Sequence, residues 1–260
     1  MSTNEERCAF DYLIRTNSID VFKLLLKNPN VSSTIDYSYV LKAAAACGNI
    51  EMVKSLIEEA PADLIDACNV ALASAAESGH TEVVQLLLMQ TGVDPAADHS
   101  FAIRSAACKG HADVVKLLLL DSRSDPSILG NLAIRLSSAY GHTEVVKLLS
   151  ADPRVDLKTD DYSSFVKATQ NGHAETLRFL LSIDTPPEAI QLNIIAVASY
   201  IGNVEMISIW LEQLGHRANA DMYEKFDHQK FSMPVKELWM DHLLTHCSKT
   251  REIAKRLMLK

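Results

Sequence analysis

The sequence predicts an all-α fold in which short helices form stacked pairs, and three observations carry this prediction. Glycines recur at positions 48, 79, 110, 141, 172 and 202, with four successive spacings of 31 residues and a last spacing of 30. Apolar residues follow these glycines at helical spacing, as in "GHTEVVKLLS" from Gly141 to Ser150. Small residues such as Ala75 and Ala76 precede several of the glycines, where they let a neighbouring helix come close.

The recurring glycine position is expected to adopt a left-handed backbone. Asn17 lies 31 residues before Gly48 and is followed by "SIDVFKLLL", which matches the later segments. Gly and Asn are the residues that most readily adopt this conformation, and they are typical of the site just after a helix C-terminus. The sequence therefore predicts seven units. Their turn residues are Asn17, Gly48, Gly79, Gly110, Gly141, Gly172 and Gly202.

Each unit is expected to contain a finger turn, a short first helix, the glycine turn and a longer second helix. An acidic residue stands three positions after each turn residue, for example Glu144, where it complements the helix dipole. Two short helices cannot bury their own apolar faces, but stacked neighbours can. The units are therefore expected to form a solenoid.

This pattern resembles the ankyrin repeat family over about residues 1–217. The resemblance rests on the "GHTEVV" segments and the small-residue pairs before them. The family's unit is about 33 residues long and carries TPLHxA in its first helix. Here that slot holds "FAIRSA" (Phe101–Ala106) and "LAIRLS" (Leu132–Ser137), so the shortening is expected to fall in the fingers between units. The resemblance implies an ankyrin-type helical solenoid of about seven repeats.

Residues 218–260 do not continue the 31-residue pattern and are expected to form a connector and a C-terminal helical cap. Pro234 suits a first helical position, and Thr250 suits the N-cap of a second short helix. A repeat array needs such a polar-faced end. An alternative stays open, because Ser232–Leu244 also resembles a degenerate F-box core. That resemblance implies a ubiquitin-ligase substrate adaptor.

Composition limits the classes of function. The net charge of −8 argues against nucleic-acid binding, because phosphate contacts need clustered Lys and Arg. Five cysteines without a CxxC pair indicate a reducing compartment, which we take as the cytoplasm, with nuclear entry left open. The N-terminus lacks a secretory signal, and no apolar run is long enough to suggest a membrane span. We expect a monomer that binds another protein.

Catalytic and metal-binding patterns are weak. Histidines recur at the position after the turn glycine, but they lie too far apart to share an ion, so a structural histidine bonded across the turn is favoured. They are His80, His111, His142 and His173. His242 and His246 share a predicted helical face, but no further ligand cluster accompanies them. No phosphate-binding glycine loop and no GxSxG segment occurs. We expect no enzyme activity, no cofactor and no metal.

The resemblance also implies where a partner binds. In ankyrin arrays the first helices line a concave surface, and the two residues before the turn glycine point outward there. Those pairs vary here while the framework repeats. Tyr and Arg, which dominate interface energetics, occur among the candidates. The predicted partner-binding residues are Arg104, Arg135, Lys109, Tyr140, Gln170, Tyr200 and Ile201.

Overall fold

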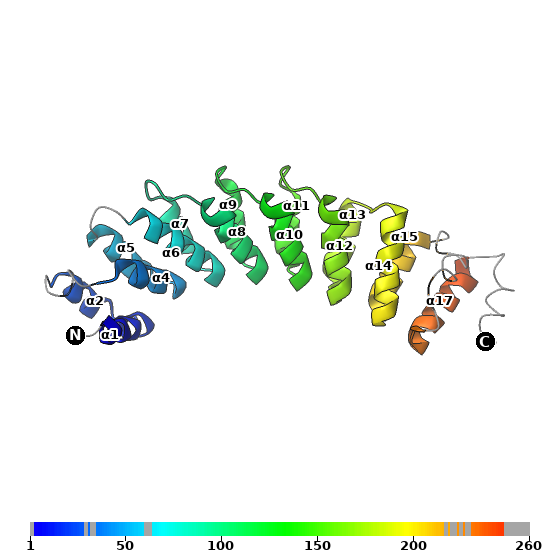
Figure 1. Ribbon diagram of the computed structural model, residues 1–260, viewed down its shortest axis with the longest axis horizontal. Coiled ribbons are helices and arrows are strands. Elements are labelled where there is room, and N and C mark those ends of the chain that lie inside the picture. Colours follow the sequence, from blue (N-terminus) through cyan, green and yellow to red (C-terminus); the bar gives the residue numbers. More distant parts are fainter. Residues whose placement is uncertain are drawn as a thin grey trace. The chain divides into compact units, whose positions relative to one another are not determined.

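The computed structural model describes residues 3–28, 31, 35–59, 64–215, 218, 223, 226 and 230–246. This part of the chain contains fifteen α-helices and no strand, which confirms the predicted all-α fold (Figure 1). Contacts divide the chain into two compact parts, each with several repeats, which we call unit 1 and unit 2. Unit 1 comprises Met1–Ser137 and Glu144–Asp156, and unit 2 comprises Ser138–Thr143 and Leu157–Lys260.

Seven helix pairs correspond to the seven predicted repeats. The first helices are α1 (Thr3–Arg15), α4 (Tyr37–Ala46), α6 (Ile65–Ser78), α8 (Ala97–Lys109), α10 (Ile128–Tyr140), α12 (Thr159–Asn171) and α14 (Glu188–Ile201). The second helices are α2 (Ile19–Leu26), α5 (Ile50–Glu59), α7 (Thr81–Leu88), α9 (Ala112–Leu120), α11 (Thr143–Ser150), α13 (Ala174–Ile183) and α15 (Val204–Leu214). One more helix, α17 (Met233–His246), follows.

The expectation that the second helix is the longer one is wrong. The first helix is clearly the longer one in two pairs, with 14 residues in α6 against 8 in α7 and 14 in α14 against 11 in α15. The second helix ends early because a finger begins soon after its last buried leucine, such as Leu87. The bounds of α8, α10 and α12 also include a short left-handed turn at their start, which is described below.

Helices of the same kind lie side by side within each unit. In unit 1, α4 packs on α6 and α6 on α8, while α5 packs on α7 and α7 on α9. In unit 2, α12 packs on α14, and α15 packs on both α13 and α17. The interior is apolar, and Val84, Leu87 and Ile207 are completely buried. Burial between neighbouring pairs thus stabilises helices of 8 to 14 residues, which are marginal in isolation.

The glycine turns are left-handed, as predicted. Gly79, Gly110 and Gly202 have φ near +80°, and Asn17 has φ of +48°. At Gly79 the backbone N–H groups of the turn return to the carbonyls of Ala75 and Ala76, which ends helix α6. Only Gly79 and the N-cap residue His80 separate α6 from α7, so these two residues set the angle between the helices of this pair.

Three first helices begin with a short left-handed turn that was not expected from the sequence. The runs are Asp98–Ser100, Leu129–Asn131 and Asp160–Tyr162, and every residue in them has φ between +49° and +66°. Six of these nine residues are Asp, Asn, His or Gly, which tolerate this conformation best. A recurring cluster of such residues before "AIR" or "SSF" is the sequence signal for this turn.

Arginines hold successive fingers together in unit 1. Arg123 donates to the Asp121 carboxylate through Nε (3.0 Å) and Nη2 (2.6 Å), and through Nη1 to the Val93 carbonyl oxygen (2.8 Å). Arg154 repeats this arrangement with Asp152. Its Nη1 donates to the carbonyl oxygen of a serine in the preceding finger. The hydrogen bonds from the arginines are the main cause that lowers the pKa of both carboxyl groups.

Helix α17 occupies the place of a second helix of an eighth repeat. Trp210 of α15 donates from Nε1 to Thr169 Oγ1, and Trp239 of α17 donates in the same way to Ser199 Oγ (3.2 Å). Thr169 and Ser199 each stand three residues before a turn glycine. The stack therefore continues at α17, although the 31-residue pattern fails there. The predicted helix after Thr250 lies outside the described residues, and the boundary at residue 217 stays a prediction.

Candidate protein interface

The residue just before each turn glycine is exposed, as expected for a position that does not pack against a neighbouring helix. Tyr140 is 58% exposed and Ile201 is 56% exposed. Lys109 is also exposed, whereas Gln170, one position earlier in its repeat, is half-buried. Within each unit, we call the exposed and half-buried residues that lie nine, six, five, two and one positions before a turn residue the first-helix face. Tyr140 and Ile201 are its notable members, because they are apolar side chains at positions where contact with water favours polar ones.

The two predicted arginines have a structural task that the sequence did not reveal. Arg104 donates from Nε to the carbonyl oxygen of His99 and from Nη2 to that of Asp98, both at 2.8 Å. Arg135 donates from Nη1 to the carbonyl oxygen of Gly130 at 3.4 Å. These acceptors belong to the left-handed turns, so each arginine stabilises the turn that begins its own helix. The guanidinium of Arg104 also lies 5.3 Å from the centre of the Phe101 ring.

The predicted aromatic residues of unit 2 differ in how firmly they are held. The Tyr140 ring stacks on His142 with a centroid distance of 6.2 Å and remains largely exposed. The Tyr200 ring, 47% exposed, makes an edge contact with Phe231 at 5.4 Å. Tyr200 therefore also anchors the chain that leads into α17. Tyr140 and Ile201 are the predicted residues of this unit most available to a partner.

The recurring histidines are structural, although their partner is not in their own turn. Nε2 of His80 lies 2.9 Å from the carbonyl oxygen of Ala46, in the preceding repeat. His111 and His173 make the same contact, 34 residues back in the sequence. Asn49 replaces the histidine in its repeat and donates to the carbonyl oxygen of Ile14. The side chain just after the turn glycine therefore joins neighbouring repeats, because it forms a hydrogen bond with a carbonyl oxygen near the end of the previous first helix.

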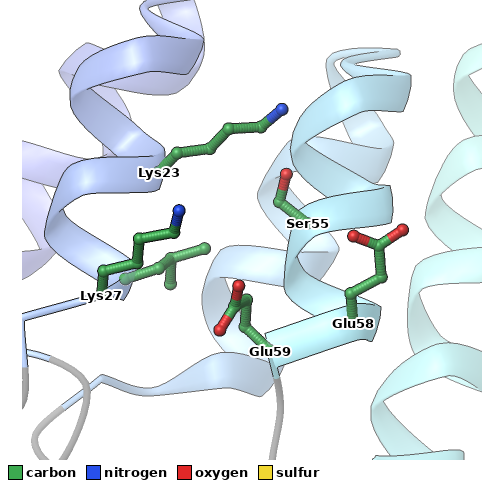
Figure 2. A pocket seen from close by; sticks show the side chains of 6 residues that line it. Lys23, Lys27, Ser55, Glu58 and Glu59 are labelled. Atoms are coloured by element: carbon green, nitrogen blue, oxygen red, sulfur yellow. The ribbon is translucent and has the colours of Figure 1, made fainter.

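A small polar pocket of about 170 Å³ lies between α2 and α5. Figure 2 shows Lys23 of α2 extending toward α5, Lys27 just after the end of α2, and Glu58 and Glu59 at the end of α5. Two lysines and two glutamates balance each other's charge, so the pocket has no clear preference for an anion or a cation. Its lining residues are Lys23, Leu26, Lys27, Ser55, Glu58 and Glu59.

Within the described ranges, no group of three His, Cys, Asp or Glu side chains is arranged to hold a metal ion. His242 is buried, and its Nε2 lies 3.0 Å from the carbonyl oxygen of Gly215. Among the helices that the structure describes, none has both the length and the apolar character needed to cross a membrane.

Comparison with known proteins agrees with this architecture. The crystal structure of the human ASB11 ankyrin repeat domain is similar to this chain, with a TM-score of 0.53 and 20% sequence identity. The alignment covers 66% of this chain and 82% of that one, and at this identity it shows the fold alone. No curated protein matches the chain. The family model described as "Ankyrin repeats (3 copies)" matches residues 10–99 and 103–194, well over half of the sequence. The chain therefore belongs to the ankyrin repeat family.

Proposed function

We propose that this protein is a non-catalytic scaffold that binds a partner protein through its first-helix face, the concave side of ankyrin repeat arrays. Ankyrin repeats are generally protein–protein interaction modules. The observation that carries the proposal is the exposure of Tyr140 and Ile201, each the last residue before a turn glycine. At that position the side chain does not serve the stack, so its apolar character is available for recognition.

The arginines of the predicted site support the proposal in a modified form. Arg104 and Arg135 are held by their own left-handed turns, which places their guanidinium groups in a fixed orientation. A pre-ordered side chain loses less entropy when it meets a partner. We therefore keep both arginines, with Lys109, Gln170 and Tyr200, as proposed binding residues, but their substitution also tests the turns.

The cellular setting is part of the proposal. We place the protein in the cytoplasm as a monomer. The described cysteines form no disulfide, which is consistent with a reducing compartment. They are Cys8, Cys47, Cys68 and Cys108.

The ubiquitin-ligase adaptor remains an alternative proposal. Its F-box-like segment coincides with α17, whose Val235, Trp239 and Leu243 are completely buried. Side chains engaged in this way favour a cap over a ligase-docking helix. Co-purification of a ligase subunit with the full chain, and its loss on removal of residues 218–260, would support the adaptor instead.

The test of the proposed function uses two matched triple variants in affinity capture from the native cell. The first carries Lys109→Ala, Tyr140→Ala and Ile201→Ala on the first-helix face. The second carries Lys116→Ala, Met89→Ala and Leu120→Ala, which lie on or just after second helices and are also exposed. We expect the first variant alone to lose a protein that the wild type captures, with an unchanged melting temperature. Equal capture by both variants would argue against this face.

A further inference from the structure

Positive charge is concentrated on the first-helix face of unit 1, although the whole chain has a net charge of −8. We consider the residues nine, six, five, two and one positions before the turn residue on α1, α4, α6, α8 and the unit 1 part of α10. The second helices of the same unit carry seven acidic residues against four lysines. The face carries five basic residues against two acidic ones. They are Arg15, Lys42, Arg104, Lys109 and Arg135 against Asp11 and Glu77.

Several of these cations are available to a ligand. Lys42 and Lys109 are exposed, and neither forms an ion pair within the part of the chain that the structure describes. Arg104 uses two N–H groups on backbone carbonyls, which leaves its other N–H groups for a carboxylate. Asp11 is already engaged, because its carboxylate accepts a hydrogen bond of 2.9 Å from the Tyr39 hydroxyl.

An apolar row accompanies the basic residues. It lies nine positions before the turn residue on four successive first helices. Val70 is 48% exposed, and the other three members are half-buried. The row consists of Tyr39, Val70, Phe101 and Leu132. A ligand that covers both rows needs carboxylates on one edge and apolar side chains on the other.

We infer that this face binds an acidic peptide segment of a partner protein, with Asp or Glu side chains near Lys42, Lys109 and Arg104. The inference rests on the proposed function and names the chemistry of the partner. The acids in the first turns of α6 and α8 are Asp66 and Asp98. They repel an acidic ligand beside these two turns, so its carboxylates are directed to the neighbouring cations of the face.

The test begins with a random dodecapeptide phage library selected on the full-length protein. We expect the enriched peptides to be acidic and to carry aromatic or aliphatic residues. Each is then labelled with fluorescein and titrated against two charge-reversal variants. One carries Lys42→Glu and Lys109→Glu, and the other carries Lys23→Glu and Lys116→Glu on the second helices. Both variants change the net charge of the protein equally.

The inference predicts that the Lys42/Lys109 variant weakens peptide binding about fivefold or more, with a reduced salt dependence, because two ion pairs are replaced by repulsion. The Lys23/Lys116 variant is expected to bind as the wild type does. Equal weakening by both variants would mean non-specific attraction and overturn the inference. So would selection of no peptides, or of peptides without acidic residues. Non-acidic peptides that are lost with the Lys109/Tyr140/Ile201 triple variant would overturn the acidic partner but leave the proposed function standing.

Discussion

At the scale of single residues, the turn glycines meet two separate requirements. The first is the left-handed backbone, which Asn17 also adopts. The second appears only in the stack, because a Cβ atom on Gly79 would lie 2.6 Å from Nδ1 of His111. The His173 ring likewise occupies the space beside Gly141. The sequence predicts that asparagine is tolerated at Gly141, as at position 17, but the structure indicates a clash with that ring.

Gly202 separates the two requirements, because a Cβ atom there would have Ser232 Oγ as its nearest neighbour at an ordinary 3.7 Å. Gly202→Ala is therefore expected to cost about 1–2 kcal/mol from the backbone alone. Gly79→Ala is expected to cost at least about 1 kcal/mol more, since the histidine ring must move. Urea unfolding of both variants measures the difference.

A double variant checks the cause. If the ring of His111 is the obstacle, the cost of Gly79→Ala combined with His111→Ala is less than the sum of the two single costs. Additive costs, or equal costs at Gly79 and Gly202, would show that only the backbone conformation matters.

At the scale of elements, the left-handed turn at the start of α10 contains one residue that fits it poorly. Leu129 has φ of +54° and is 51% exposed, so it bears the strain without burying much surface. Leu129→Asn is expected to stabilise the protein by about 1 kcal/mol, because asparagine tolerates this conformation. Leu120→Asn is the control, since Leu120 is 79% exposed in the regular helix α9. A loss of stability in both variants would contradict the turn.

Arg123 with Asp121 and Arg154 with Asp152 join successive fingers, and we call these contacts the finger clamps. They predict that the stability of the protein depends on pH. Hydrogen bonds from Arg123 and Arg154 are the main cause that holds the pKa of Asp121 and Asp152 below the ordinary value. The folded protein thus binds fewer protons than the unfolded chain at acid pH, and the clamps lose their stabilising effect as the pH falls below about 4. The variant Asp121→Asn with Asp152→Asn is expected to be less stable at neutral pH.

Its free energy of unfolding is also expected to depend less steeply on pH between about 5 and 3 than that of the wild type. Urea unfolding at several pH values measures both effects. Glu58→Gln with Glu77→Gln removes the same formal charge without touching a clamp. If that control flattens the pH profile equally, general charge repulsion is the cause, and the clamps are not.

At the scale of the whole molecule, the C-terminal segment closes the stack of unit 2. Ile207, Trp210 and Leu211 of α15 are buried, and α17 packs against this helix. Removing residues 218–260 is expected to uncover this apolar surface and to cause self-association with a lower melting temperature. Light scattering and thermal unfolding measure these effects.

A milder variant tests the same contact without deleting the segment. Trp239→Phe keeps most of the apolar surface but removes the N–H that Ser199 accepts, which leaves a buried hydroxyl without that donor. A cost of about 1–2 kcal/mol is expected. A 1–217 fragment that remains monomeric and melts with the full chain would show that the segment is no cap.

The sequence by itself determined the repeat, the left-handed turn at Asn17 and the glycines, and the family. These features follow from local rules, since glycine conformation and apolar periodicity are properties of a few neighbouring residues. The exposure of Tyr140 and Ile201 was also predictable, because variable positions within a fixed framework lie outside the core.

Only the tertiary structure decided which groups these side chains meet. The histidine partner lies 34 residues away in another repeat, and Arg104 turns back to its own helix start. The left-handed run at Leu129 includes a residue that disfavours it, so local preference alone would not place it there. The hydrogen bond from Trp239 to Ser199 likewise joins residues that lie 40 positions apart in the chain.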